Sequence, residues 1–229
     1  MKTMDLKEAK KFWLVGLGIQ FAYYLYIIIV PFMEKIAVPE IVIDILINLS
    51  SVLVIVAMKI ISDLANDQKI FYYPIAGFVM NFVWKLLRKP ISNMVFKAPA
   101  TSKEEITSIL WRSLFFDSIP YWVIILASVF LMLLALKRIS TIFNDSRFKN
   151  AGVIQFVGCI ISVVYGILNI SMVISKQMSN SLRLTFWDTV SKISGWIMFV
   201  SIVLWVIALV IEVIAIVNMK LERRKEEEI

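Results

Sequence analysis

Long apolar runs without a charged residue alternate with short charged stretches along the chain. A helix rises 1.5 Å per residue, so about 20 apolar residues cross the hydrocarbon core of a bilayer. The segments that approach this length are residues 12–33, 41–58, 70–87, 118–136, 150–175 and 193–219. The pattern predicts an all-α, polytopic transmembrane helix bundle of about six spans. We expect one transmembrane domain over residues 1–220 and a charged cytoplasmic tail over residues 221–229.

The third segment gives the weakest signal. Its charge-free core, residues 70–84, is shorter than a usual span. It reaches the required length only if Lys85 extends it and places its ammonium group at the interface. Without this segment the chain would have five spans, and the distribution of Lys and Arg over the two sides fits both counts.

The connection over residues 85–117 predicts a further, shorter helix. Ser102 and Glu105 fit a capping box, and apolar residues then recur at helical spacing. We therefore expect a short amphipathic helix near residues 102–114 that lies at the membrane interface. Asp117 is then expected to cap the fourth span, with Pro120 in its first turn.

Composition strengthens the membrane interpretation and excludes other classes. Hydrophobic residues make up 60% of the 229 positions and charged residues 18%, with a net charge of +7. The basic residues lie between the apolar runs, which is typical of cytoplasmic loops and not of nucleic-acid binding. We expect a multi-pass protein of a prokaryotic plasma membrane with both termini cytoplasmic. Its expected partners are the lipid bilayer and either another membrane protein or a second copy, but no nucleic acid.

The residues of most catalytic and metal sites are scarce. The sequence has no His and a single Cys, so most hydrolytic, redox and metal-binding arrangements cannot be built. No glycine-rich phosphate loop is present either. We expect no enzyme activity, no catalytic or metal-binding residue and no cofactor.

Two segments of the chain resemble each other. Residues 57–67 read AMKIISDLAND and residues 135–145 read ALKRISTIFND. With six spans both segments would face the cytoplasm, and the chain would consist of three parallel helical hairpins. With five spans the two segments would face opposite sides. An internal repeat whose two similar segments lie on the same side of the membrane therefore favours six spans.

Both segments end in an Asn-Asp pair. Asn66 and Asp67 end the first, and Asn144 and Asp145 end the second. Asn and Asp favour turns and helix ends, which explains the pairs structurally. A cytoplasmic docking site for a partner protein is the functional alternative.

Glu212 is the sharpest functional candidate, because it lies inside the sixth apolar segment. Carboxylates are expensive within a bilayer and often mark ion or proton pathways. One interpretation is a proton or cation site that faces the bundle interior. The other is a hydrogen bond to a neighbouring helix, or a side chain that reaches back to Lys220 or to the interface.

The remaining candidates are uncharged. Gln20, Asn81 and Gln155 lie within odd-numbered spans, where interhelical hydrogen bonds or pore lining could explain them. Gly158, Ser162 and Gly166 recur every four residues and predict close helix packing, either within the bundle or between two copies. Trp13 lies near a span end and fits an interfacial aromatic belt.

Four stretches carry a resemblance to a known family. They are residues 6–10 (LKEAK), 49–63 (LSSVLVIVAMKIISD), 148–152 (FKNAG) and 204–215 (LWVIALVIEVIA). The chain resembles an uncharacterised, largely archaeal, prokaryotic integral membrane family, domain-of-unknown-function family 996. The resemblance implies a multi-span membrane protein and supplies no activity. It leads us to expect Gln where this chain has Glu212, which supports a packing role for that residue.

Two functions remain after these arguments. The slightly favoured one is a non-enzymatic scaffold or accessory subunit of a membrane complex, since polar residues are scarce within the spans. The alternative is a small-solute or ion transporter or channel that uses Glu212 and the interior polar residues.

Overall fold

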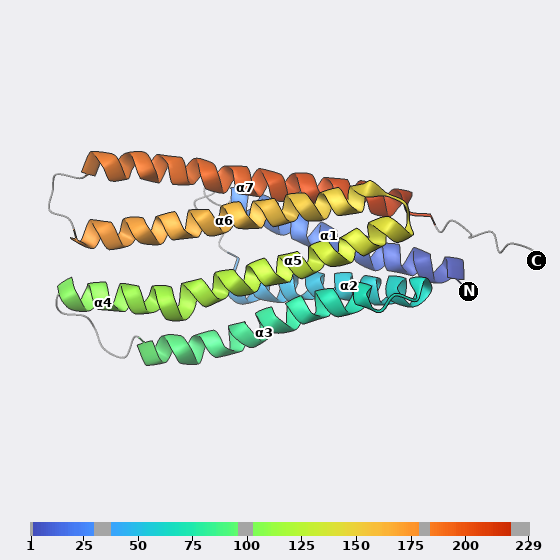
Figure 1. Cartoon of the computed structure of the whole chain (residues 1–229), viewed down its shortest axis with the longest axis horizontal. Helices are drawn as coiled ribbons and strands as arrows, with labels where there is room; N and C mark the ends of the chain where they lie inside the picture. Colours follow the sequence, from blue (N-terminus) through green and yellow to red (C-terminus); the bar gives the residue numbers. More distant parts are fainter. Residues whose placement is uncertain (1, 30–37, 96–102, 179–183, 221–229) are drawn as a thin grey trace, which may run out of the picture. The chain divides into compact units, whose positions relative to one another are not determined.

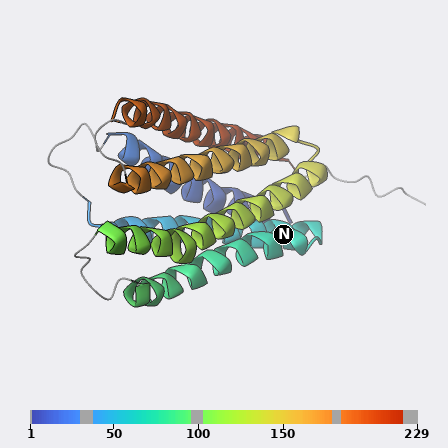
Figure 2. The same cartoon turned by 60° about the vertical axis from the view of Figure 1, so that its left-hand side comes forward.

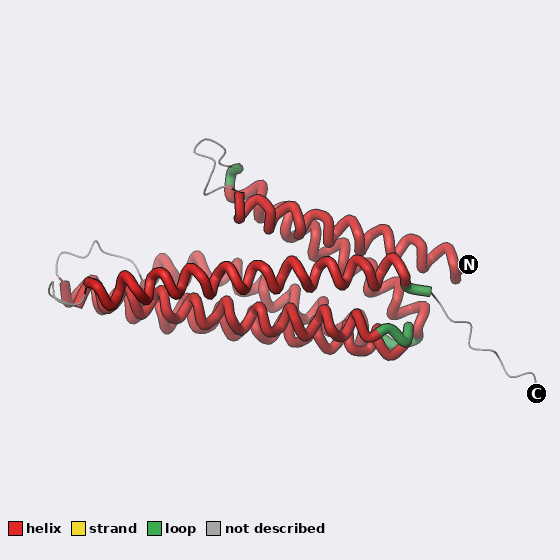
Figure 3. Tube along the Cα trace, turned by 90° about the horizontal axis from the view of Figure 1, so that it is seen from above, coloured by secondary structure: helices red, strands yellow, loops and turns green. Residues whose placement is uncertain are grey.

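The computed structural model describes residues 2–29, 38–95, 103–178 and 184–220, and nearly all of them are helical (Figure 1). The helices are α1 (Lys2–Ile29), α2 (Glu40–Ala65), α3 (Lys69–Val95), α4 (Lys103–Ser113), α5 (Ile119–Ile142), α6 (Ser146–Met178) and α7 (Leu184–Asn218). A π-helical turn, η2 (Leu114–Ser118), joins α4 to α5. No strand occurs among the described residues, as Figure 3 shows. The all-α prediction is confirmed.

Five helical stretches of the described chain are long and apolar enough to cross a membrane. They are Ile41–Ala65, Lys69–Arg88, Trp111–Ile142, Ser146–Met172 and Val190–Asn218. These helices indicate a multi-pass membrane protein, and the weak third segment is among them. Helix α1 is 28 residues long, but its role as a sixth span stays a prediction. Residues 30–33 of that predicted span, and the tail over residues 221–229, lie outside the described residues.

The exposed faces of these helices are apolar. A helix at the surface of a soluble protein turns its polar face outward. Helix α7 does the reverse, because one exposed stripe along it has hydrophobic residues every three or four positions. They are Ile193, Trp196, Val200, Val203, Ile207, Val210, Ile214 and Val217. Such a stripe is suited to lipid tails.

The chain divides into two compact units, and the first comprises Met1–Ile75, Leu131–Ile154 and Trp205–Ile229. One hydrophobic cluster fills it. The cluster includes residues from the start of α1 and the end of α7. It also includes residues from the helix ends on both sides of the turn between α2 and α3 and of the turn between α5 and α6. Its members there are Ala9, Ile61, Ile70, Ile139, Phe148 and Ile216. Within this unit the start of α1, the end of α7 and both turns therefore lie together, and the number of spans stays a prediction. Which side of the membrane they face stays a prediction.

The second unit comprises Ala76–Phe130 and Gln155–Leu204. It holds most of α3, then α4 and η2, and the adjoining parts of α5, α6 and α7. The prediction of a single transmembrane domain is not tested by this division.

Helix α4 differs from the expected interfacial helix. A helix does form over residues 103–113, while Ser102 lies outside the described residues. It then runs through η2 into α5 without a loop (Figure 2). Asp117 is therefore not an N-cap, and that prediction is wrong. Its carboxylate instead accepts bonds of 2.7 and 3.0 Å from the Arg88 guanidinium of α3.

Pro120 explains why this continuous helix contains a π turn. A proline within a helix has no N–H to donate, and its ring clashes with the carbonyl four residues earlier. A π turn just before it widens the helix and relieves this conflict. Accordingly, the Ile119 N–H donates to the carbonyl of Leu114, five residues back.

Candidate functional site

Glu212 lies on α7 in the first unit, with 0% of its surface exposed. One of its carboxyl oxygens accepts a 2.7 Å hydrogen bond from the Trp13 indole N–H of α1. The Trp13 ring in turn stacks on Phe148 of α6, with centroids 5.6 Å apart. Trp13 is fully buried, so its predicted place in an interfacial belt is wrong. Indole and carboxyl satisfy each other where neither can reach water.

A second contact joins the same two helices. Lys10 lies one turn before Trp13 on α1, and its ammonium group donates a 3.1 Å bond to the carbonyl of Val217. That carbonyl is in the last turn of α7, where backbone acceptors lack helical partners. A cation there also meets the negative end of the helix. Burial, and secondly the charge of Lys220, lower the pKa of Lys10.

The surroundings of Glu212 are hydrocarbon. Leu209 and Ile216, one turn away on either side, belong to the buried cluster. The hydrogen bond to a neighbouring helix, expected as the structural explanation of Glu212, is confirmed. Its use as a proton or cation site stays a prediction. No group of three or more metal-binding side chains occurs in the part of the chain that the structure describes.

A serine–glycine contact recurs in three helix pairs. In each, a serine hydroxyl of the second helix lies 2.9 to 3.1 Å from the carbonyl oxygen of a buried glycine of the first. The Ser128 hydroxyl also lies 2.7 Å from the carbonyl oxygen of Ile124 in its own helix, and its single hydrogen is donated to one of the two at a time. Small residues let helix backbones approach closely in membranes. The pairs are Gly16 and Ser50 (α1 and α2), Gly77 and Ser128 (α3 and α5), and Gly158 and Ser201 (α6 and α7).

A polar side chain follows each of these glycines by four residues: Gln20, Asn81 and Ser162. The Asn81 amide donates to the Ser128 hydroxyl at 2.7 Å. The Ser162 and Ser201 hydroxyls lie 2.5 Å apart. These contacts confirm interhelical bonding for Asn81 and place the predicted packing at Ser162 within the chain.

The serine-bearing helices share a longer register. Seven residues after each serine stands a fully buried alanine: Ala57, Ala135 and Ala208. Eleven residues after each serine stands another fully buried side chain, which is Ile61 in α2, Ile139 in α5 and Glu212 in α7. Glu212 therefore occupies a position that the other two helices fill with isoleucine, so close packing there does not itself require a carboxyl group.

The two turns ending in Asn-Asp have the same backbone. Asn66 and Asn144 adopt left-handed conformations with φ of 53° and 49°. The N–H groups of Asp67 and Asp145 each bond, at 3.0 Å, to the carbonyl five residues earlier. This is the pattern of a helix C-cap, which tolerates Asn when Gly is absent.

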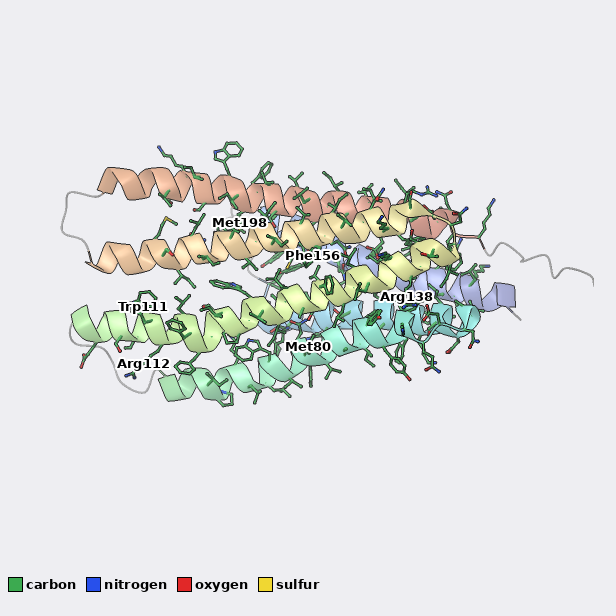
Figure 4. The ribbon with its side chains drawn as sticks, viewed as in Figure 1. Met80, Trp111, Arg112, Arg138, Phe156 and Met198 are labelled. Atoms are coloured by element: carbon green, nitrogen blue, oxygen red, sulfur yellow. The ribbon has the colours of Figure 1, made fainter. Side chains whose placement is uncertain are left out.

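Both aspartates also begin the next helix. Asp67 accepts the backbone N–H of Lys69 at 3.1 Å, and Asp145 accepts that of Arg147 at 3.0 Å. Arg138, labelled on α5 in Figure 4, reaches Asp67 at 2.8 Å. The Arg147 side chain pairs with Asp145 at 2.8 Å and holds the pKa of that carboxyl below its ordinary value. The predicted turn role of these residues is confirmed, and the docking role stays a prediction.

The other candidates fall into separate places. A Cβ atom at Gly166 would lie 2.8 Å from the Trp122 ring of α5, so this glycine admits a tryptophan. Gln155 is buried. The structure thus places Asn81 in the contact between α3 and α5, and Gly158 and Ser162 in the contact between α6 and α7. It does not gather the candidates around one site.

Sequence reasoning missed the residues that complete these contacts, namely Trp13, Ser50, Ser128 and Ser201. The signal for the three serines was a Gly followed four positions later by a polar residue, and a Ser followed seven positions later by Ala, whereas Trp13 belongs to neither pattern. Both patterns are short, so each gains meaning only when repeated three times.

Comparison with known proteins gives no relative. No family model, no curated protein and no solved structure matches this chain.

Proposed function

We propose that the protein is a non-enzymatic scaffold or accessory subunit that binds another membrane protein in a prokaryotic plasma membrane. The observation that carries this proposal is the set of three serine–glycine contacts. They use interior polar groups to hold helices of the same chain together. Polar groups engaged in this way favour a packed structural element over a solute path. The resemblance to family 996 is part of the proposal and adds no activity.

We also propose that the chain is an internal repeat of three hairpins, formed by α1 with α2, α3 with α5, and α6 with α7. Each pair contributes one serine–glycine contact, with glycine on the first helix and serine on the second. The two like turns after α2 and α5 support the same division. Such a repeat presents similar outer faces, one of which would hold the partner.

Site-directed photo-crosslinking in native membranes tests the scaffold proposal. A photoreactive phenylalanine analogue replaces one exposed residue per hairpin: Val52 in α2, Val79 in α3 and Val203 in α7. Ala208, which is fully buried on α7, provides the matched inward control. A scaffold gives an adduct with one recurrent membrane protein from one face only. Adducts with lipid alone from all three positions would refute it, and an adduct of twice the chain's mass would indicate self-association.

A transporter is the second candidate, favoured by Glu212 alone. A fully buried carboxyl that replaces an isoleucine of the other helices is unusual enough to need a reason. The test is proton and cation flux in liposomes that contain the purified protein. The scaffold proposal predicts the flux of protein-free liposomes. A flux that Glu212→Gln abolishes would support the transporter proposal and contradict the scaffold proposal.

A further inference from the structure

The Lys10 ammonium group reaches the last turn of α7, which ends two residues before the exposed Lys220. Lys10 lies within bonding distance of the α7 carbonyl of Val217, and its pKa is lowered by burial and by the nearby charge of Lys220. Lys7 lies three positions before Lys10 and so shares its helix face. Two ammonium groups that repel each other create a place for an anion.

Three aspartates near the turns of this unit are already engaged. Each of the three described near its turns forms an ion pair with a basic residue of the same unit. The pairs are Lys59 with Asp63, Arg138 with Asp67, and Arg147 with Asp145. Glu8 is exposed two positions before Lys10, where helical side chains do not face each other. None of these ion pairs includes Lys7, Lys10 or Lys220.

The lysines also lie where the apolar faces of their helices stop. Val217 is 59% exposed and stands three residues before Lys220. Val15 is 49% exposed and follows Lys10 by five residues, and the exposed Lys11 precedes Val15 by one turn on the same helix face. Side chains that follow an exposed apolar stripe lie at the level of lipid headgroups, where lysines extend towards the interface.

We propose that Lys10 and Lys220, with Lys7 beside them, bind the phosphate of an anionic phospholipid headgroup. The ligand's acyl chains would lie along the apolar faces of α1 and α7, and its phosphate would separate the two ammonium groups. The inference goes beyond the scaffold proposal and does not depend on it, because either a scaffold or a transporter can hold such a lipid.

Lipid titration of the purified, full-length protein in neutral detergent tests the site. Dioleoylphosphatidylglycerol or dioleoylphosphatidylcholine is added. Native mass spectrometry then counts the bound lipid molecules, and the melting temperature of the protein is measured in parallel. Each lysine near an anionic lipid contributes about fivefold in affinity. The Lys10→Gln/Lys220→Gln variant should therefore bind phosphatidylglycerol about 30-fold more weakly. Lys192→Gln, an exposed lysine at the other end of α7, should bind it like the wild type.

A charge-preserving variant separates binding from folding. Lys10→Arg/Lys220→Arg should keep phosphatidylglycerol binding, and added salt should weaken it. Equal binding of phosphatidylcholine, or unchanged phosphatidylglycerol binding by the double glutamine variant, would overturn the proposal. Equal stabilisation by inorganic phosphate at the same concentration would also overturn it, because the ligand would then be a free anion.

Discussion

Gly16 and Gly18 lie two positions apart on α1 and should respond oppositely to the same substitution. A Cβ atom at Gly16 would lie 2.9 Å from a Val54 methyl group and 3.0 Å from the backbone carbonyl oxygen of Ser50. A Cβ atom at Gly18 would meet nothing within 4 Å. The pair therefore isolates the effect of the close approach between α1 and α2.

The magnitude follows from three contributions. Alanine in place of glycine favours a helix by about 1 kcal/mol at either position. At Gly16 the added methyl group overpacks the contact, which costs about 1–3 kcal/mol. The shift also weakens the Ser50 bond, and such interhelical bonds contribute about 0.6 kcal/mol in membranes. Gly16→Ala should thus lower the free energy of unfolding by about 0.5–2.5 kcal/mol, whereas Gly18→Ala should raise it by up to about 1 kcal/mol.

Thermal unfolding in detergent measures the difference. For a chain of this length, 1 kcal/mol corresponds to about 2–4 °C in melting temperature. The two variants should therefore melt on opposite sides of the wild type and several degrees apart. Equal shifts would refute the reasoning, because they would mean that α1 and α2 do not approach at Gly16.

Three further predictions concern single polar residues. Ser128→Ala should lower the free energy of unfolding by about 1 kcal/mol, because the Gly77 carbonyl and the Asn81 amide each lose one hydrogen bond and keep only the bond to each other; an unchanged melting curve would contradict the contact. Glu212→Gln should change the free energy of unfolding in detergent by less than about 1 kcal/mol, since an amide oxygen still accepts the Trp13 indole N–H, whereas Glu212→Ile should cost clearly more. The bond from Arg147 lowers the pKa of Asp145 below 3.8, so the carboxylate stabilises the fold above that value and loses the effect as pH falls through the lowered pKa. Melting curves between pH 2 and pH 7 should show this loss in the wild type and not in Asp145→Asn.

Local patterns predicted the parts of this fold that depend on neighbouring residues. Charge-free runs located the helices, and Asn66 and Asn144 marked the turns because Asn tolerates a left-handed backbone. The contacts between helices were harder, since they depend on which faces meet. Trp13 shows this most clearly: its position near a span end suggested an interfacial belt, but α7 brings Glu212 against its indole. Nothing in the local sequence of α1 indicates that partner.

Asp117 shows a second kind of failure. An Asp just before a Pro-containing apolar run is typical of a helix start. The rule assumes that a loop precedes the helix, whereas here α4 is already helical and η2 absorbs the proline. The carboxylate is then free to pair with Arg88, a residue too distant in sequence for a local pattern to reveal.

The π turn at Leu114–Ser118 also affects how the chain tolerates changes in length. Each residue of an α-helix advances the direction of the next side chain by about 100°. A π turn holds one residue more than an α turn, so a deletion within it would leave the register of α5 unchanged and cost only the relief that the turn gives Pro120. A deletion in the middle of α5 would instead rotate Ser128 away from Gly77 or turn the buried Ala135 towards lipid. We therefore expect relatives that have lost one residue to have lost it between Leu114 and Ser118, and engineered deletions of Phe116 to fold where deletions of Phe130 do not. Equal yields of folded protein from both deletions would show that the register of this helix is not fixed by its partner.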